Sequence, residues 1–88
     1  MPKIVKEIVL KNAQGLHARP AALFVQIATR YNSEVTIRRG DEVVNGKSIM
    51  GLLTLGVQPG STIVLEIDGD DAEALGKELE ALLVQDTL

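Results

Sequence analysis

The sequence predicts an α+β fold, an open-faced β-sandwich in which three helices cover one face of a four-stranded antiparallel sheet. Two long stretches carry apolar residues at helical spacing, and shorter stretches alternate apolar with polar residues. The links around the central hairpin are short, which favours antiparallel over parallel pairing. Each stretch has one apolar face, so the most economical packing is a sheet with all helices on one side. The predicted order is βαββαβα.

The first half of the chain predicts a strand, a long helix and a hairpin. Apolar residues alternate imperfectly over residues 3–10, and the turn-forming segment Asn12–Gly15 follows. Over the range Ala18–Tyr31, apolar residues recur at the spacing of one helix face. Gly40-Asp41 then forms the turn of a β-hairpin between two short alternating stretches.

The second half begins with a short helix and the last strand. Ser48 precedes the dense apolar segment 49–55, which suits one or two helical turns with Ser48 as the N-cap. Pro59-Gly60 makes a sharp turn, after which residues 63–67 alternate as a strand.

The terminal helix is predicted from a capping signal and an apolar face. Asp70 and Glu73 have capping-box spacing at its start. Its apolar face is formed by Ala72, Leu75, Leu79, Leu82 and Leu83. The chain has 88 residues and no linker or internal repeat, so residues 1–88 are expected to form one domain.

The composition excludes several classes of protein. Hydrophobic residues make up 45% of the chain and aromatic residues 2%, so the core must be aliphatic and disorder is excluded. The absence of cysteine excludes disulfides and cysteine-ligated zinc. A net charge of −3 disfavours nucleic acid as a partner. No apolar run approaches the ~20 residues of a membrane span, and the first residues do not resemble a signal peptide, so a cytoplasmic location is expected.

The candidate chemistry lies in the octapeptide Gly15–Ala22, directly at the start of the long helix. Pro20 is tolerated in a first helical turn, which puts His17 at or beside the N-cap. Unpaired amides and the helix dipole disfavour the imidazolium there and keep a ring nitrogen available as a nucleophile. If that nitrogen accepts a phosphoryl group, the anion lies where helix N-termini bind phosphate, and Arg19 adds a charged donor.

This chemistry needs no metal and no cofactor, because phosphoryl transfer depends mostly on positioning and electrostatics that a partner can complete. One histidine without cysteine or a spaced partner cannot supply a metal site. The plainer alternatives stay open at this point. A lone histidine at a helix start is commonly a cap or a surface residue, Arg19 alone is usually solvated, and Ser48 alone is an N-cap worth about 1 kcal/mol.

The whole chain resembles the histidine-containing phosphocarrier (HPr) family of the bacterial sugar phosphotransferase system. The segment GLHARPAA, Gly15–Ala22, is similar to the active-site motif of that family, and KSIMGLLTLG, Lys47–Gly56, is similar to its second, serine-centred motif. Both motifs occur in the family's order and at its spacing. The chain departs from the family at Gln14, where relatives often carry a short Asn or Ser, so a side-chain bond from this turn to the phosphoryl group is in doubt.

The resemblance implies that His17 is phosphorylated at Nδ1 by phospho-enzyme I, whose phosphoryl group comes from phosphoenolpyruvate. His17 then passes the group to enzyme IIA domains of sugar permeases. Arg19 would stabilise the phosphoryl group, with the amides of Ala18 and Arg19 as donors. Such a carrier is a phosphohistidine intermediate between larger enzymes and not an independent catalyst, and it is expected to be a monomer.

The resemblance also implies a docking surface beside His17, formed by Ala22, Gln26, Lys47, Ile49, Met50 and Leu53. Two different partners must bind one surface, which calls for an adaptable apolar patch next to the transferring atom. We expect Met50 and one other of the apolar residues on the short helix to be exposed, the alternative being simple core packing. Lys47 and Arg19 would supply local positive charge for acidic partners.

Ser48 matches the position that HPr kinase/phosphorylase modifies in many Gram-positive-type relatives. A phosphate there would place negative charge at a helix N-terminus and beside the docking surface. Two alternatives follow. The chain could be a non-transferring regulatory module that acts on a catabolite-control transcription factor through phospho-Ser48, although such paralogues replace the active histidine. It could also be a nitrogen-branch phosphocarrier, which the Lys47–Gly51 segment disfavours.

Overall fold

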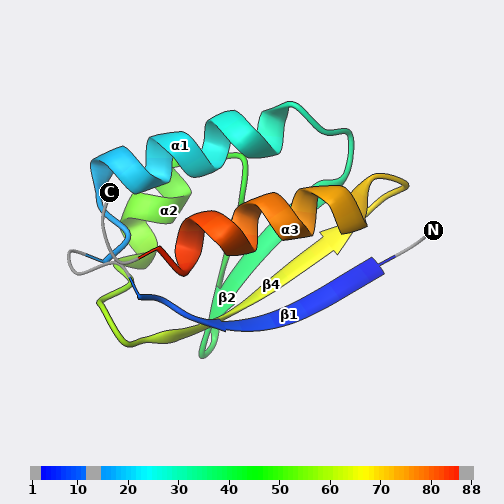
Figure 1. Cartoon of the computed structure of the whole chain (residues 1–88). Helices are drawn as coiled ribbons and strands as arrows, with labels where there is room; N and C mark the ends of the chain where they lie inside the picture. Colours follow the sequence, from blue (N-terminus) through cyan, green and yellow to red (C-terminus); the bar gives the residue numbers. More distant parts are fainter. Residues whose placement is uncertain (1–2, 12–14, 86–88) are drawn as a thin grey trace.

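The computed structural model describes residues 3–11 and 15–85, and it confirms the predicted order βαββαβα (Figure 1). The elements are β1 (Lys3–Val9), α1 (Ala18–Thr29), β2 (Glu34–Arg39), β3 (Glu42–Asn45), α2 (Ile49–Leu55), β4 (Thr62–Asp68) and α3 (Ala72–Leu83). The two long helices and the two tight turns fall where the apolar spacing and the Gly-containing dipeptides predicted them.

The strands form one antiparallel sheet in the order β1-β4-β2-β3. β4, the last strand in sequence, therefore lies between β1 and β2 and pairs with both. Ile63, Leu65 and Ile67 of β4 alternate with more exposed residues, and all three are buried beneath the helices. β4 is thus the strand that connects β1 to the β2–β3 hairpin within the sheet.

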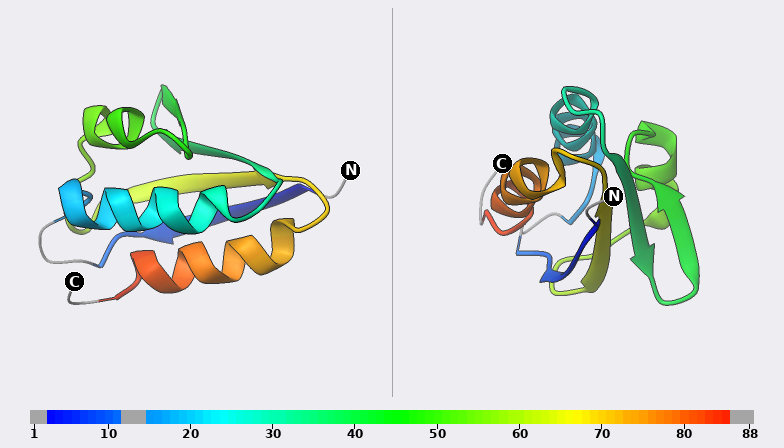
Figure 2. Two further views of the ribbon diagram at one scale, coloured as in Figure 1. Left: turned by 90° about the horizontal axis from the view of Figure 1, so that it is seen from above. Right: turned by 90° about the vertical axis from the view of Figure 1, so that its right-hand side faces the viewer.

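All three helices lie on one face of the sheet, as predicted (Figures 1 and 2). Phe24 of α1 and Leu75 and Leu79 of α3 are fully buried between the helices and the strands. The opposite face is open, with Val5 and Val43 exposed on it. None of the helices in the described residues is long and apolar enough to cross a membrane.

The capping box predicted from Asp70 and Glu73 is wrong. Asp71 is the N-cap of α3, and its side chain does not cap that helix. Its carboxylate instead accepts hydrogen bonds from the amide of Asn32, at 2.9 Å, and from the amide and hydroxyl of Ser33. The Ser33 hydroxyl, with help from the Asn32 amide, holds the pKa of Asp71 below its usual value of 3.8. The carboxylate thus joins the α1–β2 loop to the β4–α3 loop.

Two smaller differences concern the ends of elements. The long helix was predicted to reach Tyr31, but α1 ends at Thr29. The first strand ends at Val9, although Leu10 continues its direction and donates a hydrogen bond to the carbonyl of Ser61 at 2.9 Å. Such shifts of one or two residues are usual where helix and strand ends fray.

Candidate functional site

His17 is the N-cap of α1, as the sequence predicted. Its backbone is extended, with φ −105° and ψ −167°, and its carbonyl accepts the first helical hydrogen bond from the amide of Ala21 at 2.9 Å. The His17 side chain makes no capping bond, and the first turn of α1 carries no acidic residue. The positive end of this helix dipole is therefore left without a compensating side chain, which makes it a favourable place for an anion.

The imidazole ring is half-buried, with Nε2 turned inward. Nε2 is buried and has no hydrogen-bond partner among the described residues. Nε2 is therefore not accessible from solvent without rotation of the ring, so a reaction of this ring with another molecule would favour Nδ1. A buried polar atom without a partner costs on the order of 1–3 kcal/mol, and such groups are often found where a site has a chemical role.

The residues after His17 provide donors and one anchor. Ala18 and Arg19 are exposed, and they occupy the first two helical positions, whose amides have no intrahelical partner. Pro20 has no amide hydrogen, so its place in the first turn costs no helical hydrogen bond, and its ring is buried against the core. The first turn of α1 is thus anchored in the core by Pro20, while Ala18 and Arg19 just before it are exposed.

The segment before His17 contacts the residues that follow α2. The amide of Leu16 donates a hydrogen bond to the carbonyl of Val57 at 2.9 Å. Gly15 has a φ of +74°, and a Cβ at this position would lie 2.5 Å from the same carbonyl oxygen. Val57 itself is only 2% exposed. This contact was not predicted from the sequence, because Val57 carries no polar side chain or turn signal that would mark it.

Ser48 is the N-cap of α2, which confirms that prediction. Its backbone is extended, and its Oγ accepts a hydrogen bond from the amide of Gly51 at 3.0 Å. The Ser48 carbonyl also accepts from the amide of Leu52 at 3.1 Å. The hydroxyl oxygen is therefore already positioned at the start of a helix, where negative charge is stabilised.

α2 presents an apolar surface beside the N-terminal half of α1. Met50 is 73% exposed, Ile49 41% and Leu53 38%. The prediction that Met50 and one other of these residues are exposed is confirmed, and all three are. Leu52 and Leu55 on the other side of α2 are buried. Figures 1 and 2 both place α2 next to the first turns of α1, where His17 lies.

Two residues of α1 complete the predicted docking surface. Ala22 is half-buried and Gln26 is exposed, and they lie one and two turns beyond Ala18 on the same side of the helix. Their spacing places them along the exposed face of α1 that continues from the His17 end.

Lys47 lies differently from the expectation for a charge beside His17. Its ammonium donates a hydrogen bond to the carbonyl of Tyr31 at 2.8 Å, beyond the C-terminal end of α1. The 12 residues of α1 make a helix about 18 Å long, and His17 is at its other end. The Tyr31 hydroxyl donates to the carboxylate of Glu78 on α3, and this bond raises the pKa of Tyr31. Of the two predicted cations, only Arg19 belongs to the same end of α1 as His17, and Lys47 bonds to a residue beyond the other end.

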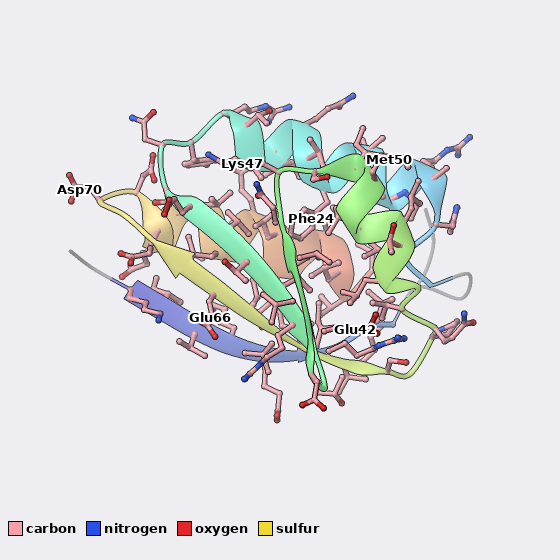
Figure 3. All side chains as sticks on the ribbon, turned by 180° about the vertical axis from the view of Figure 1, so that it is seen from behind. Phe24, Glu42, Lys47, Met50, Glu66 and Asp70 are labelled. Carbon is pink, nitrogen blue, oxygen red and sulfur yellow. The ribbon has the colours of Figure 1, made fainter. Side chains whose placement is uncertain are left out.

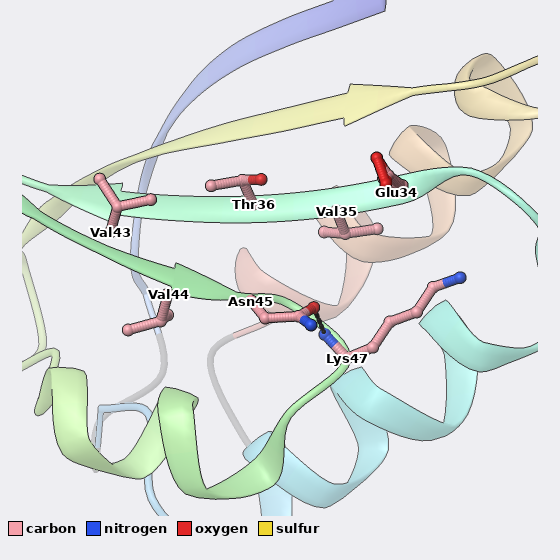
Figure 4. A pocket seen from close by; sticks show the side chains of 7 residues that line it. All are labelled: Glu34, Val35, Thr36, Val43, Val44, Asn45 and Lys47. Atoms are coloured by element: carbon pink, nitrogen blue, oxygen red, sulfur yellow. Dashed lines mark hydrogen bonds between the residues drawn. The ribbon is translucent and has the colours of Figure 1, made fainter.

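An open groove of about 380 Å³ lies between β2 and β3 and includes Lys47 (Figure 4). The backbone amide of Lys47 donates to Oδ1 of Asn45 at 2.8 Å, which fixes the turn into α2. The lining residues are Glu34, Val35, Thr36, Val43, Val44, Asn45 and Lys47. His17 is not among them, so the groove is separate from the candidate phosphoryl site.

The remaining predictions concern a metal site and the residues before Gly15. Within residues 3–11 and 15–85, no cluster of metal-ligating side chains occurs. Gln14, the departure from the family motif, lies outside the described residues, as do Asn12 and Ala13 of the predicted turn.

Comparison with known proteins gives a consistent result. Residues 4–85 match the family described as "PTS HPr component phosphorylation site". The HPr-like protein Crh of Halalkalibacterium halodurans is 46% identical over 80 residues, which cover 91% of this chain and 92% of that protein. The phosphocarrier protein HPr of Neisseria meningitidis serogroup A is 48% identical over 71 residues, 80% of each chain. The crystal structure of phosphocarrier protein HPr from Bacillus anthracis superposes with a TM-score of 0.89 at 38% identity, over 94% of this chain and 99% of that one.

Proposed function

We propose that this chain, which belongs to the HPr family of phosphocarrier proteins, accepts a phosphoryl group on His17 and passes it to a second protein. The observation that carries the proposal is the position of His17 as the N-cap of α1, with its ring free of any capping bond. A nucleophile in that position is followed by amide donors that can hold the transferred group.

In the proposed transfer, the lone pair of Nδ1 attacks phosphorus and a new N–P bond forms. The bond between phosphorus and the donor breaks, and its electron pair leaves with the donor. The negative oxygens then lie close to the amides of Ala18 and Arg19, and the Arg19 guanidinium adds a charge-assisted donor. The burial of Nε2 supports Nδ1 as the reacting atom. The reverse transfer follows the same path, because the group has only to be released to the next acceptor.

The proposed partners are enzyme I as donor, itself phosphorylated from phosphoenolpyruvate, and enzyme IIA domains of sugar permeases as acceptors. Both would bind the exposed apolar side chains of Ile49, Met50 and Leu53, with Ala22 and Gln26 at the edge of the contact. The charge of Arg19 suits acidic partner surfaces. A single patch shared by two partners lets the group be received and released at the same atom. The carrier is proposed to act as one domain and as a monomer.

Ser48 is proposed as a regulatory phosphorylation site for HPr kinase/phosphorylase. Its Oγ is at the N-cap of α2, where a phosphate is stabilised by the helix dipole. The same phosphate would lie next to Ile49 and Met50 and would repel acidic partners. Phosphorylation of Ser48 would therefore lower transfer through His17 without disturbing the fold.

A regulatory module without transfer is the second candidate, because the chain is also similar to an HPr-like protein Crh. In that reading, phospho-Ser48 binds a catabolite-control transcription factor. The presence of His17 at the helix N-terminus favours transfer over this alternative. A phosphocarrier of the nitrogen branch would share the His17 chemistry but would use other donors and acceptors.

The test mixes the protein with enzyme I and phosphoenolpyruvate and measures acid-labile phosphate bound to the protein. The proposal expects a stoichiometric adduct that His17→Ala abolishes and Ser48→Ala retains. An active enzyme I that gives no adduct would overturn the proposal. If function in cells were lost with Ser48→Ala and kept with His17→Ala, the regulatory module would replace it.

A further inference from the structure

Met50 is the most exposed of the large apolar side chains in the described residues, at 73%. It lies on α2, which packs beside α1 (Figure 3). Its neighbours on the same surface, Ile49 and Leu53, are hydrocarbons that cannot be oxidised under mild conditions. Met50 is therefore the one place on this surface where a solvent oxidant meets a thioether sulfur.

We propose that Met50 is an oxidation site through which peroxide controls docking of the phosphoryl-transfer partners. A lone pair of the thioether sulfur attacks one oxygen of the peroxide, and the O–O bond breaks. The sulfur gains that oxygen and is oxidised by two electrons, while the other oxygen leaves as hydroxide with the electron pair of the O–O bond. The hydroxide takes the proton of the transferred oxygen, which gives the sulfoxide and one molecule of water. The inference rests on the proposed function, because it names a chemical regulation of the same docking surface.

The chemical change converts a flexible apolar side chain into a polar one at the point of contact. A partner that covers Met50 must remove water from the S=O dipole, and an apolar partner surface offers it no hydrogen bond. Burial of a polar group without a partner is unfavourable, and a complex about tenfold weaker is the expected size of the effect.

Oxidation of Met50 should leave the fold unchanged. Leu52 and Leu55 on the opposite side of α2 hold the helix to the core and are at most 1% exposed. Within α2, the backbone carbonyl of Met50 accepts a hydrogen bond from the Thr54 hydroxyl at 2.7 Å, and the thioether takes no part in this bond. A sulfoxide out in solvent leaves these contacts unchanged. Oxidation should thus weaken docking while the thermal unfolding of the protein stays the same.

The experiment oxidises the purified protein with hydrogen peroxide, removes the peroxide with catalase, and then adds enzyme I and phosphoenolpyruvate. Mass spectrometry of a peptide containing Met50 measures the sulfoxide. We expect a rise of about tenfold in the enzyme I KM for the oxidised carrier, with kcat retained. Treatment with methionine sulfoxide reductases should restore the original KM.

Two variants distinguish the effect of oxidising Met50 from the effects of oxidising Met1 and of general damage by peroxide. In Met50→Leu, whatever its own KM, peroxide treatment should leave that KM unchanged. Met50→Gln, which places a polar group of similar length there, should show the raised KM without any peroxide.

A KM that is unchanged when Met50 is fully converted to sulfoxide would overturn this inference and leave the proposed function intact. A peroxide effect of equal size in Met50→Leu would also overturn it. If the untreated protein accepts no phosphoryl group from active enzyme I, the proposed function has failed instead.

Discussion

The amide of Leu16 and the carbonyl of Val57 are joined by a hydrogen bond of 2.9 Å. This bond ties the residue before His17 to the segment that leaves α2. The segment that leads into His17 is therefore linked directly to the segment that follows α2, although the two are far apart in sequence. For a partner docked on Met50 as proposed, this link would help to hold His17 in position, and in-line transfer requires such positioning.

Gly15→Ala should both destabilise the protein and slow phosphoryl transfer. The φ of +74° costs an L-residue about 1–2 kcal/mol, and the new Cβ would come within 2.5 Å of the Val57 carbonyl oxygen. Relief of that contact must move the Leu16–His17 segment. Urea unfolding and the rate of phosphorylation by enzyme I check the two effects.

Gly40→Ala is the matched control for Gly15→Ala. Gly40 has a φ of +59°, but no atom lies within 4 Å of a Cβ built there. The control should lose about 1 kcal/mol from backbone strain and transfer the phosphoryl group at the original rate. Equal transfer rates in both variants would show that the contact of Gly15 and Leu16 with the Val57 carbonyl does not position His17.

Ser48→Ala should remove the N-cap of α2 and lower the free energy of unfolding by about 1 kcal/mol. Ser48→Asp should keep a capping oxygen for the amide of Gly51 and add a negative charge at the helix N-terminus. Stability should then be retained, while the KM of enzyme I rises because the charge lies beside the docking surface. Denaturant unfolding together with transfer kinetics separates the two effects, and a Ser48→Asp variant that transfers normally would argue against regulation through charge.

Leu53→Gln should weaken docking through loss of an apolar contact on α2. The expected result is a several-fold higher KM of enzyme I with little change in kcat, since the transferring atom is untouched. Val43→Gln is the control, because Val43 is 58% exposed on β3 and outside the proposed surface. A comparable rise in KM in the two variants would mean that enzyme I does not bind specifically to the exposed apolar side chains of α2.

Acid should weaken the fold through Asp71. The pKa of this carboxyl is lowered in the folded protein by the Ser33 hydroxyl and the Asn32 amide, so the folded state prefers the ionised form. Its contribution to stability is complete above the unfolded value of 3.8 and is lost as the pH falls through the folded pKa. Urea unfolding at a series of pH values should show a loss below about pH 4. In Asp71→Asn the loss over this range should be smaller, and an identical acid profile would exclude Asp71 as its source.

Local patterns predicted the fold well because each of them agrees with the tertiary packing. Phe24 lies on the apolar face of a helix, and β4 alternates cleanly, so helix and strand periods alone identify their elements. The role of Asp71 was missed for the opposite reason. Its partners, Asn32 and Ser33, are distant in sequence and lie next to it because β2 and β4 pair in the sheet.

The candidate site, like the fold, was predictable where its signals are local in sequence and not where it depends on distant contacts. His17 at the helix N-terminus follows from Pro20 and the start of the apolar repeat, which are local signals. Val57 was not predictable, because a backbone carbonyl can be the partner of Leu16 whatever side chain the residue carries. The Lys47 ammonium was expected near His17, yet it bonds to the Tyr31 carbonyl, a contact that depends on how α1 and the turn before α2 meet in space.

The most direct test of the account is a ³¹P and ¹⁵N NMR measurement on the protein after exposure to enzyme I and phosphoenolpyruvate. We expect a single acid-labile phosphohistidine signal, coupled to Nδ1 of His17, which is lost in His17→Ala and unaffected by Ser48→Ala. A phosphoryl group found only as acid-stable phosphoserine, or on Nε2 of the ring, would contradict it.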